Sequence, residues 1–200
     1  YLGIVGFGQS NIANRIIRDE PIHPIENVYM WDWTNGKCYL FSEPLVGTDG
    51  VGGNLLTDVV MNLKLENIRK PILVAPMAKG GSSVFFWYKG KQKYRLDKFL
   101  QISKKSNLNF DYWLWLQGET DARPDLYLPF QNIAFNSEIG EINYFYSTAL
   151  DEIFNKVKTQ YPNAVFGVSL TSKCNNNGNY YVRMGQKQVI EDRDDTFFTF

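Results

Sequence analysis

The sequence lacks several features that mark common classes of protein. It contains no run of roughly 18 apolar residues, so we expect no membrane-spanning helix. Its 21 basic residues balance its 21 acidic ones, and no basic stripe stands out. Nucleic-acid binders usually present such a stripe to the phosphate backbone, so we expect no nucleic-acid partner.

Histidine and cysteine are also scarce. The single histidine, His23, lies between two prolines, and we interpret it as an ordinary loop residue. The only cysteines are Cys38 and Cys174, and the sequence leaves open whether they come within the roughly 7 Å that a disulfide needs. No carboxylate is accompanied by two or three His or Cys residues, so we expect no metal site and no cofactor.

What the sequence does contain is a regular alternation of two patterns. Short apolar runs predict strands, and apolar residues at three- and four-residue spacing predict helices. The predicted strands are 2–7, 28–31, 72–76, 112–116 and 164–170. The predicted helices are 11–18, 55–65, 96–103 and 142–161. The alternation predicts one α/β domain over residues 1–200, with three layers, α/β/α, around a central parallel sheet of about five strands.

Other segments refine this prediction. Asn35-Gly36 predicts a two-residue type I′ turn, so an antiparallel hairpin should decorate the second strand. Residues 123–140 have no clear period, and we interpret them as a long loop near the site. Residues 194–200 have the pattern of a further strand. Aromatic residues make up 16% of the chain; core packing explains most of them, and a sugar-binding surface is the alternative for those in polar surroundings.

Ser10 lies at the turn after the first predicted strand. Ligands of open α/β sheets bind beyond the carboxyl ends of the strands, and a hydrolase displays its nucleophilic serine there. The N-terminus of the following helix would also help to stabilise an oxyanion. The alternative is that Ser10 or Asn11 merely caps this helix.

A second polar turn, residues 117–121, follows the fourth predicted strand. The Gln117 amide is suited to donate a hydrogen bond to developing negative charge. Glu119 and Asp121 are candidate acid or base groups, and the alternative is that they cap the turn or pair with a cation. We expect Ser10 and Gln117 to face one crevice.

Two glycine-rich loops are further candidates. Gly52 and Gly53 precede the helix 55–65, where the lack of a side chain lets a backbone N–H approach a ligand closely. Gly81 and Ser82 follow the third predicted strand. The alternative for both loops is a plain turn.

Residues 6–11 also carry part of a dinucleotide-binding fingerprint. Two glycines follow a strand and open a predicted helix, and Asp32 ends the next strand about twenty residues further on. The third glycine position holds Asn11, which is too large for close helix–strand packing. A dinucleotide-binding domain is therefore the third hypothesis for this chain.

Taken together, these blocks resemble the sialate O-acetylesterase-like branch of the SGNH hydrolases, α/β esterases of flavodoxin-like architecture that remove acetyl groups from carbohydrates. Gly-Gln-Ser-Asn at 8–11 is similar to the nucleophile block of that family, and residues 115–121 to its Trp-x-Gln-Gly-Glu-x-Asp signature. Residues 52–54 and 76–83 resemble its second block and the loop after its third strand, and residues 182–186 resemble its last helix.

The resemblance implies a role for each of these residues. It makes Ser10 the nucleophile and builds the oxyanion hole from the N–H groups of Ser10 and Gly53 and from the Gln117 amide. Supporting or substrate-binding roles fall to Gln9, Asn11, Gly52, Gly81, Ser82, Glu119 and Asp121. The family also carries an Asp-x-x-His block that supplies the base, and the 200 residues do not contain it.

Two hypotheses follow besides the dinucleotide one. The first is a serine esterase that removes O-acetyl groups from carbohydrate, and the second is a carbohydrate-binding relative that lacks the histidine base and does not catalyse. Both take an acetylated carbohydrate as partner. Because acetylated glycans usually lie outside the cytoplasm, we expect an extracytoplasmic or secreted location.

Overall fold

The structure, a computed structural model, describes residues 1–20, 22–122, 140–171 and 179–199, without the side chains of 11, 141–144 and 179. Its strands form one sheet in the order β3-β2-β4-β1-β5-β6-β7, parallel at every pairing except β2 with β3. The strands are β1 (Leu2–Gly8), β2 (Val28–Asp32), β3 (Lys37–Leu40), β4 (Ile72–Ala78), β5 (Tyr112–Leu116), β6 (Val165–Val168) and β7 (Thr196–Phe198). The helices are η1 (Ser10–Ile12, a 3₁₀ turn), α1 (Leu55–Leu65), α2 (Val84–Tyr88), α3 (Lys93–Lys105), α5 (Gly140–Lys158) and α6 (Asn179–Asp192).

Strand β1 occupies the middle of the sheet. It pairs with β4 from Leu2 to Gly8 and with β5 from Ile4 to Gly8, so both of its edges are hydrogen-bonded. Its residues are buried from Gly3 onward, which explains why the sequence is apolar at consecutive positions rather than at alternate ones. The C-terminal end of β1 therefore lies between the C-terminal ends of β4 and β5.

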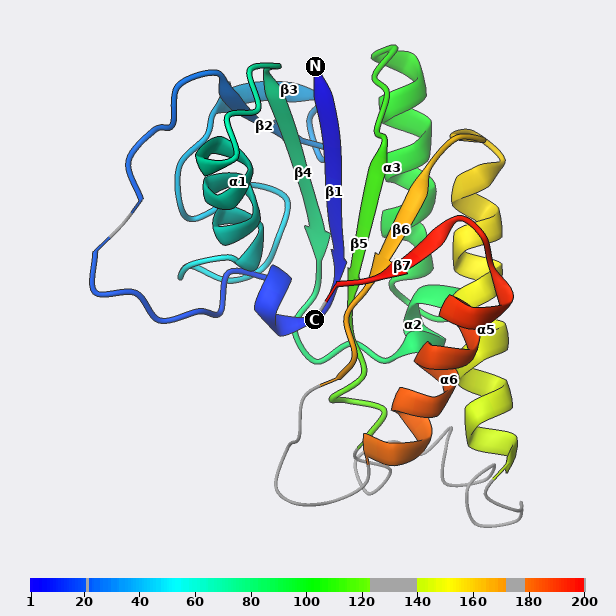
Figure 1. The fold of residues 1–200 in the computed structure, drawn as a ribbon. Coiled ribbons are helices and arrows are strands. Elements are labelled where there is room, and N and C mark those ends of the chain that lie inside the picture. The colour runs from blue at the N-terminus through cyan, green and yellow to red at the C-terminus, as the bar shows by residue number, and fades with distance from the viewer. Residues whose placement is uncertain (21, 123–139, 172–178, 200) are drawn as a thin grey trace.

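One face of the sheet holds the larger hydrophobic core, and α2, α3, α5 and α6 cover it (Figure 1). Aromatic rings fill this side: Phe7 meets Trp113 and Trp115 at centroid distances of 5.6 and 4.9 Å. All five tryptophans of the chain are buried, including Trp31 and Trp33, whereas Tyr180 is exposed. The tryptophans therefore belong to the core, as core packing predicted, and the sugar-surface alternative is wrong for them.

The opposite face is covered differently. Helix α1 packs on the β2 and β4 half of it, where Leu56 and Val60 meet Met30 and Val74. Between α1 and β7 a cavity of about 820 Å³ runs along β1 and β5; apolar side chains line most of it, among them Ile4, Leu63, Leu114, Phe197 and Phe198. The prediction of three layers, α/β/α, is confirmed. In the described part of the chain the second outer layer contains fewer helices than the first (Figure 1).

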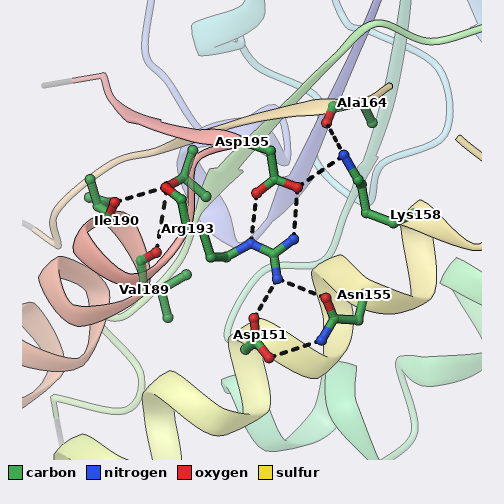
Figure 2. A network of polar contacts seen from close by, with 9 residues as sticks. Asp151, Asn155, Lys158, Ala164, Val189, Ile190, Arg193 and Asp195 are labelled. Atoms are coloured by element: carbon green, nitrogen blue, oxygen red, sulfur yellow. Dashed lines mark hydrogen bonds and ion pairs between the residues drawn. The ribbon is translucent and has the colours of Figure 1, made fainter. Parts of the chain in front are cut away.

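Strand β7 is held to the helical layer by a polar network (Figure 2). Arg193, just before β7, donates to both carboxylate oxygens of Asp195 at 2.8 Å, and also to Asp151 and Asn155 of α5. Lys158 of α5 adds a contact of 3.0 Å to Asp195. These bonds anchor β7, a three-residue edge strand that makes few hydrogen bonds to the sheet because it is short and pairs with β6 alone.

All five predicted strands are present, and the further strand predicted in 194–200 is β7. The predicted helices 55–65, 96–103 and 142–161 correspond to α1, α3 and α5, and the helix of the 182–186 block is α6. The short helix α2 was not predicted. Residues 123–139, interpreted as a loop, lie outside the described residues.

Two local predictions are wrong. Residues 11–18 form no α-helix: the 3₁₀ turn η1 ends at Ile12, Asn14 has a φ of +56°, and Ile16 pairs with Gly53 in an isolated bridge. The hairpin between β2 and β3 exists, but its loop has four residues, 33–36, and of these only Gly36 has a positive φ. The Asp32 carboxylate accepts from the Thr34 N–H and hydroxyl, which stabilises this longer loop.

Within the described residues no helix combines the length and the apolar character needed to cross a membrane, as the sequence predicted.

Candidate active site

Ser10 is carried by a tight turn between β1 and η1. Gly8 has a φ of +132°, and a Cβ atom there would lie 2.2 Å from the Leu116 carbonyl oxygen of β5. The next N–H, that of Gln9, donates to the same oxygen at 2.9 Å. Glycine is therefore required at position 8, because only a residue without a side chain lets β1 turn against the end of β5.

The hydroxyl and the backbone N–H of Ser10 are not engaged among the described residues, whereas its carbonyl oxygen accepts from the Ala13 N–H at 2.9 Å. The Ser10 side chain is half-buried, and within the described part of the chain neither its hydroxyl nor its N–H makes a hydrogen bond. Gln9, not Ser10, stands at the N-cap of η1 and makes no capping bond. The capping interpretation is thus wrong for Ser10, and the side chain of Asn11 lies outside the described residues.

The helix that was expected over residues 11–18 is replaced by the three-residue 3₁₀ turn η1. A dinucleotide site holds its pyrophosphate at the N-terminus of an α-helix, and this turn does not provide one. The contribution of a helix dipole to an oxyanion at Ser10 was predicted on the same basis and is equally unsupported. The Ser10 N–H itself remains a free donor next to the hydroxyl.

The second polar turn lies beside the first, as the sequence predicted. Gln117 immediately follows β5 and is 1% exposed. Its amide nitrogen donates to Gln9 Oε1 at 3.3 Å, to the Ser82 carbonyl oxygen at 3.0 Å and to an Asp121 carboxylate oxygen. In this arrangement these acceptors use both amide hydrogens, and the oxyanion role of Gln117 stays a prediction.

Two residues that the sequence did not point out complete the surroundings of Gln117. The Tyr146 hydroxyl, from α5, lies 2.9 Å from both the carbonyl oxygen and Oε1 of Gln117. Gln186 of α6 donates to the same carbonyl oxygen at 2.7 Å and to the Tyr146 hydroxyl at 3.2 Å. Gln186 was noted only as part of a helix. The 117–121 turn is thereby tied to both helices that pack on it.

Asp121 closes the turn. One of its carboxylate oxygens, Oδ2, accepts from Gln117 and, at 3.0 Å, from the N–H of Val84 at the start of α2. Burial raises the pKa of the Asp121 carboxyl to about 7, the hydrogen bonds from Gln117 and Val84 oppose this shift, and the charge of Glu119 adds to it. The cation nearest in sequence, Arg123, lies outside the described residues, so the ion-pair alternative stays a prediction; the bond from Val84 N–H caps the start of α2.

The loop after β4 reaches the same place. Lys79 N–H donates to the Gly8 carbonyl oxygen at 3.1 Å, and the Ser82 hydroxyl lies 3.2 Å from that oxygen. Trp87 of α2 donates to the Ser82 hydroxyl at 2.8 Å. Gly81, with a φ of +66°, makes the turn between them. Ser82 is therefore a buried link between three strand ends, whereas no contact with Ser10 is formed.

The Gly52-Gly53 loop is placed differently from the prediction. The N–H of Gly53 donates to the Ile16 carbonyl oxygen at 2.7 Å, and that of Gly52 donates to the Asn14 carbonyl oxygen at 2.9 Å. Gly53 N–H is thus not free to serve an oxyanion in this arrangement. The buried Asn54 side chain instead organises the loop, donating to the Ile12 carbonyl oxygen and to Asn14 Oδ1 at 2.8 Å each.

His23 is exposed and makes no hydrogen bond among the described residues, in agreement with its interpretation as a loop residue. Cys38 is exposed on β3, and Cys174 lies outside the described residues. The described residues contain no group of three or more His, Cys, Asp or Glu side chains that would hold a metal ion.

Similarity to known proteins is found when structures are compared, and not when sequences are. No protein-family model matches the sequence, and no curated protein matches it. A protein from Arabidopsis thaliana is similar in structure, with a TM-score of 0.75 and 16% identity over 100% of this chain and 85% of that one. A carbohydrate acetylesterase from Xanthomonas citri has a TM-score of 0.63 and 11% identity over 98% and 48% of the two chains.

A third similar structure is a variant of an acetyl xylan esterase from Geobacillus stearothermophilus, with a TM-score of 0.57 and 14% identity over 100% of this chain and 78% of that one. At such identities the similarity establishes a shared α/β/α fold with a central, mostly parallel sheet. The chemistry of this chain has to be argued from its own residues.

Proposed function

We propose that this chain is a serine esterase domain that removes O-acetyl groups from carbohydrate, with Ser10 as the nucleophile. One observation supports this above all: an unengaged serine hydroxyl lies at the C-terminal end of the central strand, next to a buried polar turn whose groups are hydrogen-bonded to one another. Ligand sites of open α/β sheets lie at this edge. Two structures of the same fold are carbohydrate esterases by name, which supports the substrate class.

In this reaction the Ser10 hydroxyl oxygen forms a bond to the carbonyl carbon of the acetyl group. The bond between that carbon and the sugar oxygen then breaks, the sugar leaves as an alcohol, and water hydrolyses the acetyl-serine to acetate. The Ser10 N–H, which has no acceptor among the described residues, is suited to stabilise the oxyanion. The hydrogen-bonded turn 117–121 supports the position of Ser10.

The Ser10 proton needs an acceptor. His23 is exposed and makes no hydrogen bond to Ser10, so it is not positioned to accept this proton. The resemblance assigns the proton to the histidine of an Asp-x-x-His block, and the 200 residues contain no such block. Among acetylated sugars, the resemblance makes O-acetylated sialic acid the first substrate to test.

The test measures acetylation of Ser10 in the 200-residue chain. The chain is mixed with p-nitrophenyl acetate, with and without imidazole as an external base, and acetyl-Ser10 is followed by mass spectrometry. We expect imidazole to accelerate acetylation at Ser10, because it replaces the absent acceptor. Ser10→Ala should remove the acetyl peptide, whereas Ser106→Ala, on an exposed serine, should leave it unchanged. Acetylation at other sites only would refute the proposal.

A carbohydrate-binding domain without catalysis is the second candidate. The observation that favours it is the single histidine of the chain, which is exposed and makes no hydrogen bond to Ser10. Saturable binding of an O-acetylated sugar, together with no acetylation of Ser10 at any imidazole concentration, would select this function over the first.

A further inference from the structure

The proposed reaction leaves one buried ionisable group unused. Asp121 is 8% exposed, and its oxygen Oδ2 accepts hydrogen bonds from Gln117 and from Val84 N–H. Its second oxygen, Oδ1, is buried and has no hydrogen-bond partner among the described residues. Burying a carboxyl group without partners for both oxygens costs free energy of folding, and a neutral side chain of the same shape would avoid this cost. A carboxyl group at this position is therefore expected to have a function that requires it.

A short chain of contacts links Asp121 to Ser10. The Gln117 amide nitrogen donates to Asp121 and, at 3.3 Å, to Gln9 Oε1. Gln9 Oε1 also accepts from the Thr120 N–H at 3.4 Å. Gln9 directly precedes Ser10, and its own N–H is bonded to Leu116. The orientation of the Gln117 amide therefore bears on the turn that holds the reactive hydroxyl.

This inference rests on the proposed function and extends it to the supporting turn. We propose that Asp121 is a positioning residue, which fixes the Gln117 amide through its carboxylate and, through Gln9, fixes the turn that presents Ser10. A charged acceptor makes a shorter and stronger bond to an amide than a neutral one does. The ionised form of Asp121 therefore makes the stronger bond to the Gln117 amide, although burial makes this form the more costly one for the fold as a whole.

The surroundings of Asp121 determine how this hold depends on pH. Among the described residues, the ionisable groups that act on it are Glu119 on the same turn and Tyr146 of α5, and α2 donates the backbone N–H of Val84. Tyr146 stays neutral because burial raises its pKa well above the ordinary value. With a pKa of about 7, the Asp121 carboxylate forms as the pH rises through neutrality.

The experiment observes the turn directly by ¹⁵N NMR of the 200-residue chain, from about pH 5.5 to about pH 8.5. We expect the Gln117 side-chain amide and the Ser10 backbone amide to shift together with a midpoint near neutral pH. Asp121→Asn should abolish both shifts, because it removes the titrating group and keeps the shape. Asp194→Asn, on an exposed carboxylate without contacts in the described structure, should retain them.

A kinetic measurement adds a second reading. In the presence of imidazole, acetylation of Ser10 by p-nitrophenyl acetate should be roughly 100-fold slower in Asp121→Asn, since small displacements of a reacting group have such effects, and unchanged in Asp194→Asn. If the two NMR signals of the wild-type chain do not titrate together, the proposal is overturned even where Asp121→Asn fails to fold. Coupled titration without any acetylation of wild-type Ser10 would support the positioning role and overturn the esterase function instead.

Discussion

The turn after β1 and the turn after β5 lie next to each other at one edge of the sheet, and they use their polar groups in opposite ways. Gln117 in the β5 turn is buried. Its side-chain nitrogen, its side-chain oxygen and its backbone carbonyl oxygen are all hydrogen-bonded. Ser10 in the β1 turn is half-buried, and its hydroxyl and N–H are unbonded within the described residues. The difference separates a hydrogen-bonded turn from the unengaged hydroxyl beside it, which is the arrangement that the proposed nucleophile requires.

The largest effect should come from breaking the junction of the two turns. Gly8→Ala would place a Cβ 2.2 Å from the Leu116 oxygen at a φ of +132°. We expect a loss of about 3 to 5 kcal/mol in the free energy of unfolding, measured by urea denaturation. Gly36→Ala is the matched control: its φ is also positive but the nearest atom lies at 3.5 Å, so about 1 kcal/mol should be lost. Equal losses would contradict the close approach of β1 to β5.

The next largest effect is a pH dependence of stability that comes from Asp121 in the β5 turn. The folded-state pKa of Asp121, about 7, lies above its unfolded value, so its stabilising contribution is complete below the unfolded pKa and is lost as the pH rises through 7. Between about pH 5 and about pH 8 the free energy of unfolding should therefore fall by roughly 3 kcal/mol from this group.

Urea denaturation at a series of pH values measures this slope. Asp121→Asn should flatten it, and Asp194→Asn should not. A slope in Asp121→Asn equal to that of the wild-type chain would mean that another group titrates.

Tyr146→Phe tests the support given by α5 with a smaller change. The hydroxyl serves Gln117, Trp115 and Gln186, so its removal leaves buried polar groups without a partner and should cost about 2 kcal/mol. Tyr94→Phe, on an exposed side chain, should stay within about 0.5 kcal/mol. Thermal denaturation of the two variants measures the difference. Similar melting temperatures for Tyr146→Phe and Tyr94→Phe would contradict a stabilising role of the hydrogen bonds made by the Tyr146 hydroxyl.

The smallest effect on stability should come from Ser10→Ala. Because the hydroxyl has no partner among the described residues, its removal should change the free energy of unfolding by less than about 0.5 kcal/mol, although it abolishes acetylation. A destabilisation comparable to that of Tyr146→Phe would show that Ser10 belongs to the support, and the contrast between the two turns would not hold.

The sequence predicted the strands well because parallel strands buried on both faces leave uninterrupted apolar runs. Its failures lie where long-range hydrogen bonds override a local pattern. Residues 11–18 have helical spacing, yet the buried Asn14 side chain bonds to the Leu45 carbonyl oxygen at 2.7 Å, which holds the chain in a turn. The pattern contains no sign of that distant acceptor.

The candidate site follows the same division. The proximity of Ser10 and Gln117 was predicted, because both follow strands that point to the same edge of the sheet. The hydrogen bonds of the Gln117 amide and of Gly53 N–H were not predicted, since the carbonyl oxygens of Ser82 and Ile16, which accept them, come from distant parts of the sequence. Tyr146 has the spacing of a core residue on an amphipathic helix, so the sequence did not predict that its hydroxyl bonds to Gln117.

The central place of β1 has a consequence for how the molecule opens. Local fluctuations begin at sheet edges and work inward, and here the edges are β3 and β7, each separated from β1 by intervening strands. Amide deuteration should therefore reach β3 and β7 long before it reaches Ile4 to Phe7. Because Ser10 lies two positions beyond the end of β1, we expect fraying at β3 or β7 to leave the position of its hydroxyl unchanged.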